Sequence, residues 1–403
     1  MLLALLVRAG GPGGRGPVSH ADRQAGAARS SSPRSPLSGP QQGWWLAHRT
    51  QVNPGGGVQL VSSRVGFALS GQPLNTLDGR LSTPDGMTVA WPSAMVLATR
   101  DGGRHWRSSL SAPGGFWGVQ FSDARHGWAV GVTSLYRTVD GGSRWRHIGE
   151  PAKALMRVAF RGATAGYGLT VQGRLVATSD GGMSWHASRW HGRGDALCVT
   201  GGEEFLIADQ NAGLWRSRGG GWVRVAAGFA RVRGFSPWWP DLSCEDKNAV
   251  ALDLAYCEAA CGGGVMSRSR QTLDDGRTWR TVGRQFGELA GLRGPPIIVH
   301  AAAFGDRGVC FVGYTTAAVV VKCRKANRAG RDALVPHLPF RGARTSIILQ
   351  GIDFLGTTAG WLLIDQSTGA ATPRQSRTQT QVWTTRDSGS SWQASYRGPT
   401  HTP

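Results

Sequence analysis

Three aspartates, Asp195, Asp241 and Asp353, are the carboxylates best placed for acid–base chemistry in this chain. A glycosidase needs two such groups facing each other across the bond that it cleaves. Each of the three lies near a stretch that we expect to be an inner strand of a sheet, where an aspartate also serves in turns and caps. The sequence therefore assigns no catalytic residue and predicts a protein that is not an enzyme.

A metal or cofactor site is also not predicted. Cys244, Cys257 and Cys261 form an alternative zinc set, but they lack the paired CxxC spacing of structural zinc sites. The ten histidines are scattered along the chain. The glycine-rich stretch 10–17 follows no strand and has no Gly-Lys-Ser/Thr ending, so it is not a phosphate loop.

Arginine and tryptophan gather in four long stretches, 186–196, 228–241, 283–296 and 367–381. The residues concerned are Arg189, Trp190, Arg193, Arg231, Arg233, Trp238, Trp239, Arg284, Arg293, Arg374 and Arg377. Exposed tryptophan beside arginine is typical of protein–protein interfaces. The alternative is that the tryptophans pack back onto the strands and the arginines are ordinary solvated charge. We take these residues as a candidate binding surface.

An eight-residue pattern recurs along the chain: Thr, any residue, Asp, any residue, Gly, two residues, Trp. Its aspartates and tryptophans are Asp101 and Trp106, Asp140 and Trp145, Asp180 and Trp185, Asp274 and Trp279, and Asp387 and Trp392. Glycine tolerates positive φ in a tight turn, and aspartate accepts hydrogen bonds from the backbone just ahead of it. The pattern predicts a hairpin whose tryptophan is a structural wedge. A partial copy at 215–222 has Ser217 where the aspartate belongs.

The spacing of these tryptophans predicts the architecture. Those at 106, 145, 185, 222 and 279 are 37 to 57 residues apart, and the next, Trp392, is about two such intervals further on. Strand-like repeats of this length are typical of four-stranded propeller blades. We predict an all-β chain: a single seven-bladed β-propeller over 44–399, with a degenerate sixth blade at about 285–350. Residues 1–43 are expected to be a disordered or targeting-like segment.

The six cysteines allow three disulfides. Cys310 and Cys323 flank 311–322 symmetrically, so a hairpin there would place them opposite each other. Cys257 and Cys261 flank a three-residue turn. Cys198 and Cys244 fall on inner strands of consecutive blades. We expect the first pair most and the third least, and disulfides would indicate an oxidising compartment.

Charge sets further limits on function. The net charge is +20, and only four of the 45 basic residues are lysines. A GC-rich coding sequence explains an arginine excess without any function. The functional alternative is a face that attracts anionic partners. No stretch has the roughly 20 apolar residues that a membrane span needs.

The repeated pattern resembles the Asp box, or BNR repeat. Residues 178–185, 272–279 and 385–392 match it in full, and 99–106 and 138–145 nearly so. The combination of 127–131 with 135–145 is most similar to the photosystem II stability/assembly factor family, and more distantly to sialidases and sortilin-type receptors. The resemblance covers about 58–395 and implies a propeller whose Asp boxes are remote from the binding site.

The expected function is a non-catalytic scaffold, similar to an assembly factor. Its partner would be an acidic or amphipathic segment of another protein, such as a membrane protein, with no nucleic acid involved. The alternatives are a sialidase-like glycoside hydrolase and a cell-surface carbohydrate-binding propeller. We expect an exported monomer, or one in an organellar lumen if residues 1–43 are a transit peptide. An upstream start codon chosen in error is the other explanation of that segment.

Overall fold

The structure is a computed structural model, and the chain divides into two units, Met1–Gly39 and Pro40–Pro403. All of the described residues belong to the second unit. They are 57–70, 80–82, 88–90, 94–113, 115–131, 134–149, 155–201, 203–209, 213–226, 236–256, 265–282, 297–304, 308–314, 319–324, 331–334, 345–368 and 377–398. The predicted boundary at 43/44 lies outside these residues and stays a prediction.

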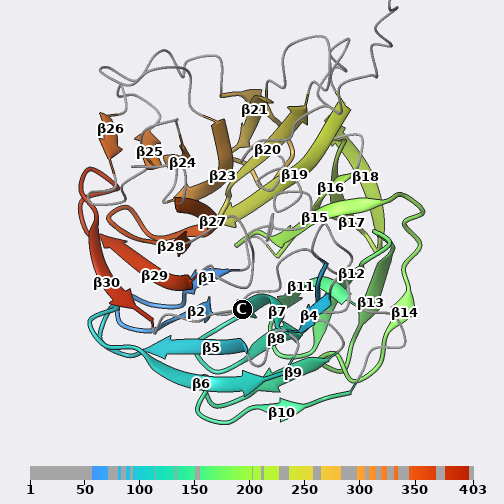
Figure 1. Cartoon of the computed structure of the whole chain (residues 1–403). Coiled ribbons are helices and arrows are strands. Elements are labelled where there is room, and N and C mark those ends of the chain that lie inside the picture. Colours follow the sequence, from blue (N-terminus) through green and yellow to red (C-terminus); the bar gives the residue numbers. More distant parts are fainter. Residues whose placement is uncertain are drawn as a thin grey trace, which may run out of the picture. The chain divides into compact units, whose positions relative to one another are not determined.

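The described strands form seven four-stranded antiparallel sheets, the blades, as predicted (Figure 1). Blade 1 is β1 (Val58–Leu60), β2 (Gly66–Ser70), β5 (Ala94–Thr99) and β6 (Arg107–Ala112). Blade 2 is β7 (Phe116–Phe121), β8 (Gly127–Gly131), β9 (Leu135–Thr138) and β10 (Arg146–His147). Blade 3 is β11 (Leu155–Arg161), β12 (Ala165–Thr170), β13 (Leu175–Thr178) and β14 (His186–Ala187). Blade 4 is β15 (Gly194–Val199), β16 (Phe205–Asp209), β17 (Leu214–Arg218) and β18 (Gly221–Ala226).

The other three blades follow in chain order. Blade 5 is β19 (Ser236–Glu245), β20 (Asn248–Tyr256), β21 (Val265–Thr272) and β22 (Arg280–Thr281). Blade 6 is β23 (Ile297–Phe304), β24 (Gly308–Tyr314), β25 (Val319–Arg324) and β26 (Arg331–Leu334). Blade 7 is β27 (Thr345–Leu355), β28 (Ala359–Thr368), β29 (Arg377–Thr385) and β30 (Gln393–Arg397). A separate hairpin, β3 (Arg80–Ser82) with β4 (Thr88–Ala90), is inserted between β2 and β5.

The first strand of each blade is its inner strand, and these strands contact one another in a closed ring. β1 contacts β7, and contacts continue through β11, β15, β19, β23 and β27 back to β1. The sequence therefore folds into a seven-bladed β-propeller, and the prediction of fold is confirmed. The apolar core lies between neighbouring blades. Phe67 of blade 1, for example, stacks on Phe121 of blade 2 with ring centroids 3.9 Å apart.

The repeated pattern forms the turn between the third and fourth strands, which we call the Thr-Asp-Gly-Trp turn. In blade 3 the Thr178 hydroxyl donates to Asp180 Oδ1 (2.8 Å) and accepts from the Gly182 N–H (3.0 Å). Asp180 Oδ1 also accepts from the N–H of Ser184 at 3.0 Å. The same three contacts recur in blades 1, 2, 5 and 7. The turn is therefore a hydrogen-bonded unit, as its sequence predicts.

Each Thr-Asp-Gly-Trp turn also packs on the preceding blade. A Cβ added at Gly276 of blade 5 would lie 2.5 Å from Leu206 of blade 4, and one at Gly142 of blade 2 would lie 2.6 Å from Phe67 of blade 1. Both glycines have positive φ, 77° and 77°. The glycine is thus required twice, for the backbone conformation and for the close approach between blades.

Blade 4 departs from this pattern. Gly219 and Gly220, with φ of 55° and 79°, make a two-residue hairpin in which Ser217 pairs directly with Trp222. Ser217 therefore belongs to the strand ladder, and its alignment with the turn aspartates is wrong. The reason is that a two-residue Gly-Gly hairpin leaves no loop for an aspartate to organise.

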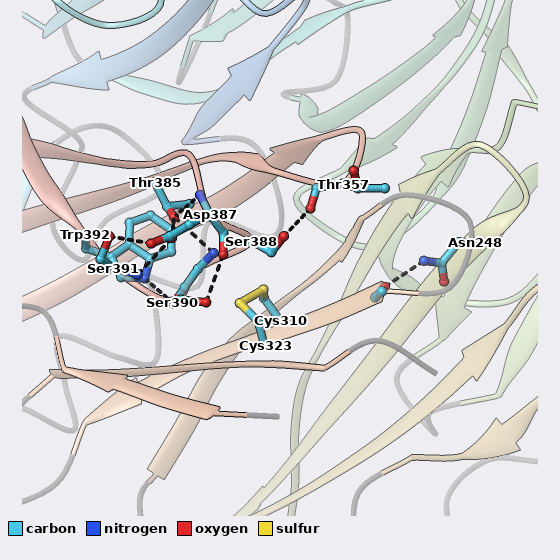
Figure 2. The surroundings of a disulfide bond; sticks show 12 residues. Asn248, Cys310, Cys323, Thr357, Thr385, Asp387, Ser388, Ser390, Ser391 and Trp392 are labelled. Atoms are coloured by element: carbon cyan, nitrogen blue, oxygen red, sulfur yellow. Dashed lines mark hydrogen bonds between the residues drawn. A yellow bond between two sulfur atoms is a disulfide. The ribbon is translucent and has the colours of Figure 1, made fainter. Parts of the chain in front are cut away.

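In blade 6, Cys310 and Cys323 pair across β24 and β25 and form a disulfide, as predicted. Figure 2 shows this disulfide beside the turn of blade 7, from Thr385 to Trp392. A Cβ added at Gly389 would collide with Cys323 Sγ and lie 3.7 Å from Cys310 Sγ. The disulfide is thus the surface on which the last turn of the ring packs.

Replacing Gly389 with alanine should destabilise the protein more than the same change at Gly356. Both residues have positive φ, 82° and 62°, but nothing lies within 4 Å of a Cβ at Gly356. Backbone strain is therefore common to both variants, and the collision with Cys323 adds about 1–3 kcal/mol at Gly389 only. Chemical denaturation measures the difference. Equal losses of unfolding free energy would show that the turn does not pack on the disulfide.

Asp180→Ala should lower the free energy of unfolding by about 1–3 kcal/mol, because it leaves the Ser184 N–H and the Thr178 hydroxyl without their acceptor. Binding of a partner should be unchanged, since the turn is structural. Thermal melts beside a binding assay test both points. A variant that kept its melting temperature but lost binding would place the turn in the functional site.

Candidate functional site

The four stretches rich in arginine and tryptophan include three connections between blades and the connection between β28 and β29. Residues 188–193, 227–235 and 282–296 connect the fourth strand of one blade to the first strand of the next, and 369–376 connects β28 to β29. In an antiparallel blade these connections share one face, which we call the connection face. The Thr-Asp-Gly-Trp turns lie on the opposite face, the turn face. The strand ends that flank the candidate stretches are thus on the other face from the structural turns.

Of the candidate binding residues, the structure describes three completely. Arg189 and Arg193 are exposed in the connection from blade 3 to blade 4. Trp190, between them, is only 6% exposed, and its ring lies 6.0 Å from that of Trp215 in a T-shaped arrangement. Trp190 is therefore not an exposed anchor. It packs into the core between blades 3 and 4, because a large apolar ring loses contact with water there.

The remaining candidate residues are described in part or not at all. Trp238 lies in β19 opposite Leu254, Trp239 follows it at an irregularity of that strand, and Arg377 begins β29 opposite Thr368. Their backbone places all three on the connection-face ends of their strands. Arg231, Arg233, Arg284, Arg293 and Arg374 lie outside the described residues, and so do Cys257 and Cys261. Their roles stay predictions.

A cavity of about 330 Å³ lies between the inner strands, along the axis of the ring. Its volume is at the lower end of the range for small-molecule sites. The polar residues that line it include Gln59, Trp117, Gln120, Arg157, Thr200 and Asp353. The sequence analysis did not single out most of these residues, although Gln120 and Asp353 share a recognisable place, just before the last aromatic residue of an inner strand.

Several polar side chains of this cavity bridge neighbouring blades. Gln59 of β1 donates to the Phe121 carbonyl (3.1 Å) and accepts from the Phe121 N–H (2.6 Å) of β7. Gln120 Oε1 accepts from the Phe160 N–H of β11 at 3.2 Å. Cys198 of β15 forms a disulfide with Cys244 of β19, which confirms the least expected of the three pairs. These residues are blade bridges, and they hold the inner strands together.

Asp353 makes the bridge between the last blade and the first. Its Oδ2 accepts from the N–H of Leu60 in β1 at 2.7 Å. Burial raises the pKa of Asp353 to about 8, an effect that the Leu60 hydrogen bond opposes and the charge of Glu245 reinforces. This carboxyl group is therefore largely protonated at neutral pH and has a structural contact that explains its position.

The other two candidate carboxylates accompany a buried arginine. Arg157 of β11 is 5% exposed, and burial lowers its pKa to about 9, while the charges of Asp241 and Asp195 act in the opposite sense. Asp241 also accepts from the N–H groups of Leu242 (3.0 Å) and Ala301 (3.3 Å). Both aspartates thus compensate the charge of Arg157 at neutral pH, a structural role for buried charges.

Three further polar atoms of the cavity lining have no protein partner. They are Trp117 Nε1, Ser122 Oγ and Thr200 Oγ1, all buried. Buried polar groups in native proteins are usually satisfied by protein, water or ligand. In the described part of the chain, no group of three or more His, Cys, Asp and Glu side chains is arranged to hold a metal ion. Nor does any helix described there have the length and hydropathy to span a bilayer.

Comparisons with known proteins find matches among solved structures. No protein-family model and no curated protein matches the chain. Similar solved structures include YCF48 bound to D1 peptide, with 15% identity, a TM-score of 0.47, and coverage of 77% of this chain and 91% of that one. YCF48 from Cyanidioschyzon merolae has 13% identity, a TM-score of 0.41, and coverage of 68% and 83%. The N-terminal domain of Nup159 has 10% identity, a TM-score of 0.41, and coverage of 85% and 98%. With values this low, the fold assignment rests on strand order and register.

Asp353→Asn should flatten the fall of stability with rising pH. Between about pH 4 and pH 8 the folded protein holds a proton on Asp353 that the unfolded chain has lost, so unfolding becomes easier as pH rises. The carboxyl lines a cavity, so we expect a total effect of only about 1–3 kcal/mol. Asparagine keeps the acceptor for the Leu60 N–H and does not ionise.

Denaturation curves at several pH values measure this effect. Asp123→Asn is the control, because hydrogen bonds from Arg125 and His126 outweigh its burial and lower the pKa of Asp123. The control variant should still lose stability as the pH rises from about pH 4 to pH 8. If Asp353→Asn loses stability in the same way, Asp353 is not the group responsible.

Proposed function

We propose that this chain is a non-catalytic scaffold that binds an acidic or amphipathic segment of another protein through its connection face. The observation that carries the proposal is the pair of exposed arginines, Arg189 and Arg193, in a connection beside the cavity-lining strands β11 and β15. The net charge of +20 supports an anionic partner, because a surplus of this size attracts negative segments from a distance.

The Thr-Asp-Gly-Trp turns support a finer assignment, an Asp-box propeller similar to the photosystem II stability/assembly factor family. In such propellers the turn is structural, which agrees with the hydrogen bonds and packing described above. The similar solved structure of YCF48 is of that protein bound to D1 peptide. The proposal for this chain rests on its own arginines and not on that likeness.

An oxidising compartment is part of the proposal. Disulfides persist outside the cytosol, and Cys198–Cys244 and Cys310–Cys323 support export to the periplasm, cell surface or medium, or residence in an organellar lumen. A membrane protein exposed on that side would be a suitable partner. The working unit is proposed to be a monomer.

Arg189→Ala/Arg193→Ala should lose most of the partners that the wild type captures in a pull-down. A second variant, in which Arg231, Arg233, Trp238 and Trp239 are changed to alanine, tests the same face. The matched control is Arg104→Ala/Arg144→Ala, which removes the same charge from exposed positions on the turn face. Capture should weaken as salt rises to 1 M, because the screening length falls from about 8 Å to about 3 Å.

Two outcomes would contradict the proposal. Equal losses in the connection-face variants and the turn-face control would show that charge alone matters and that no face is specific. Turnover of a sialoside or a glucan that persists through purification would replace the scaffold with a glycoside hydrolase.

A further inference from the structure

A cleft rich in arginine lies on the turn face, between the outer strands of blade 4 and the turn of blade 5. Its volume is about 710 Å³. The residues that line it are Glu204, Arg216, Arg218, Val223, Arg224, Val225 and Arg277. This site is on the face opposite the proposed docking surface, and its lining contains four arginines and one acidic residue, Glu204.

The cleft exists because blade 4 lacks a Thr-Asp-Gly-Trp turn. Its two-residue Gly-Gly hairpin continues the pairing of β17 with β18 as far as Arg218 and Gly221. Arg216 and Arg218 therefore both remain in the ladder, two residues apart and on one face of β17. The turn of blade 5 packs at Gly276 on Leu206 of β16 and places Arg277 at the edge of the cleft.

Arg216 is fixed in place by its neighbours. Its Nη1 donates to Glu204 Oε1 at 3.1 Å, and the Ser217 hydroxyl donates to Glu204 Oε2 at 3.0 Å. Arg216 is only 9% exposed, yet its buried Nε has no protein partner. A buried N–H without an acceptor costs stability, so an acceptor from outside the protein is the simplest explanation of this arrangement.

The other two guanidinium groups complete a site for an anion. Arg277 Nη1 donates to the Asp274 carbonyl (3.0 Å) and to Asp275 Oδ2 (3.2 Å), which orients the group, and Arg218 is exposed. Arg224 lies over the Trp215 ring at 5.9 Å and contributes charge only. With Glu204 and Asp275 counted against the four arginines, two positive charges remain.

We propose that this cleft binds a tetrahedral oxyanion with two negative charges, a phosphate or sulfate group. Arg216, Arg218 and Arg277 are its ligands, and Glu204 positions Arg216. Guanidinium groups match the oxygen geometry of such anions through paired N–H donors, which explains why arginine serves here in place of lysine. The site does not depend on the connection face or on the proposed scaffold function.

Isothermal titration of the full chain with inorganic phosphate, and separately with sulfate, tests this site at constant ionic strength in chloride. We expect saturable binding of one anion with a Kd of about 1 mM or tighter. Arg218→Ala/Arg277→Ala should raise that Kd at least about tenfold. The matched control is Arg107→Ala/Arg146→Ala, which removes two exposed arginines from the fourth strands of blades 1 and 2 and should leave Kd unchanged.

The separate titrations with phosphate and with sulfate distinguish the source of the anion. Tighter binding of one of the two identifies a phosphoryl or a sulfate group. Absence of saturable binding, or equal weakening in both double variants, would overturn the site. Arg189→Ala/Arg193→Ala should bind phosphate as the wild type does. That arm keeps a failure of the docking proposal separate from a failure of this one.

Discussion

Closure of the ring between blade 7 and blade 1 is the constraint on which the rest of the structure depends. All four strands of blade 7 are consecutive in the chain, so no shared sheet joins the two blades. Side chains make the joint instead. Asp353 accepts from Leu60, the Ser70 hydroxyl donates to Thr380 Oγ1 at 3.1 Å, and the Trp361 ring fills the space that a Cβ at Gly66 would need. Loss of this joint would expose the apolar faces of both blades.

The joint between blades 7 and 1 uses the same device as the joints between blades 1 and 2 and between blades 2 and 3. Gln59, Gln120 and Asp353 each precede an inner-strand residue, Leu60, Phe121 or Phe354, that pairs with a glycine in the first two residues of the second strand. The bridge from blade 4 to blade 5 is covalent. The polar groups of these bridges form hydrogen bonds within the protein, so they are not left unpaired around the cavity. Trp117, Ser122 and Thr200 differ, because each has a buried polar atom without a protein partner.

The sequence predicted the features that repeat and missed those that depend on neighbouring blades. The turn pattern, the number of blades and the pair Cys310–Cys323 follow from local spacing. The burial of Trp190 does not, because the rings that cover it, Trp215 and Trp222, belong to the next blade. The register irregularities of the inner strands were equally hidden. The extra residues there are as different as Trp117, Met156 and Gln350, and a bulge requires no particular residue type.

The departure of blade 4 from the repeat shows how one framework acquires a site. In blades 1, 2, 3, 5 and 7 the aspartate of the turn uses its carboxylate on its own backbone, and the glycine of the turn packs on the preceding blade. Blade 4 replaces that unit with a two-residue hairpin that continues the strand pairing up to Arg218 and Gly221. Its third strand then presents Arg216 and Arg218 in a cleft that the next turn borders but does not fill. The turn face is therefore structural in most blades, and it gains binding chemistry where the repeat fails.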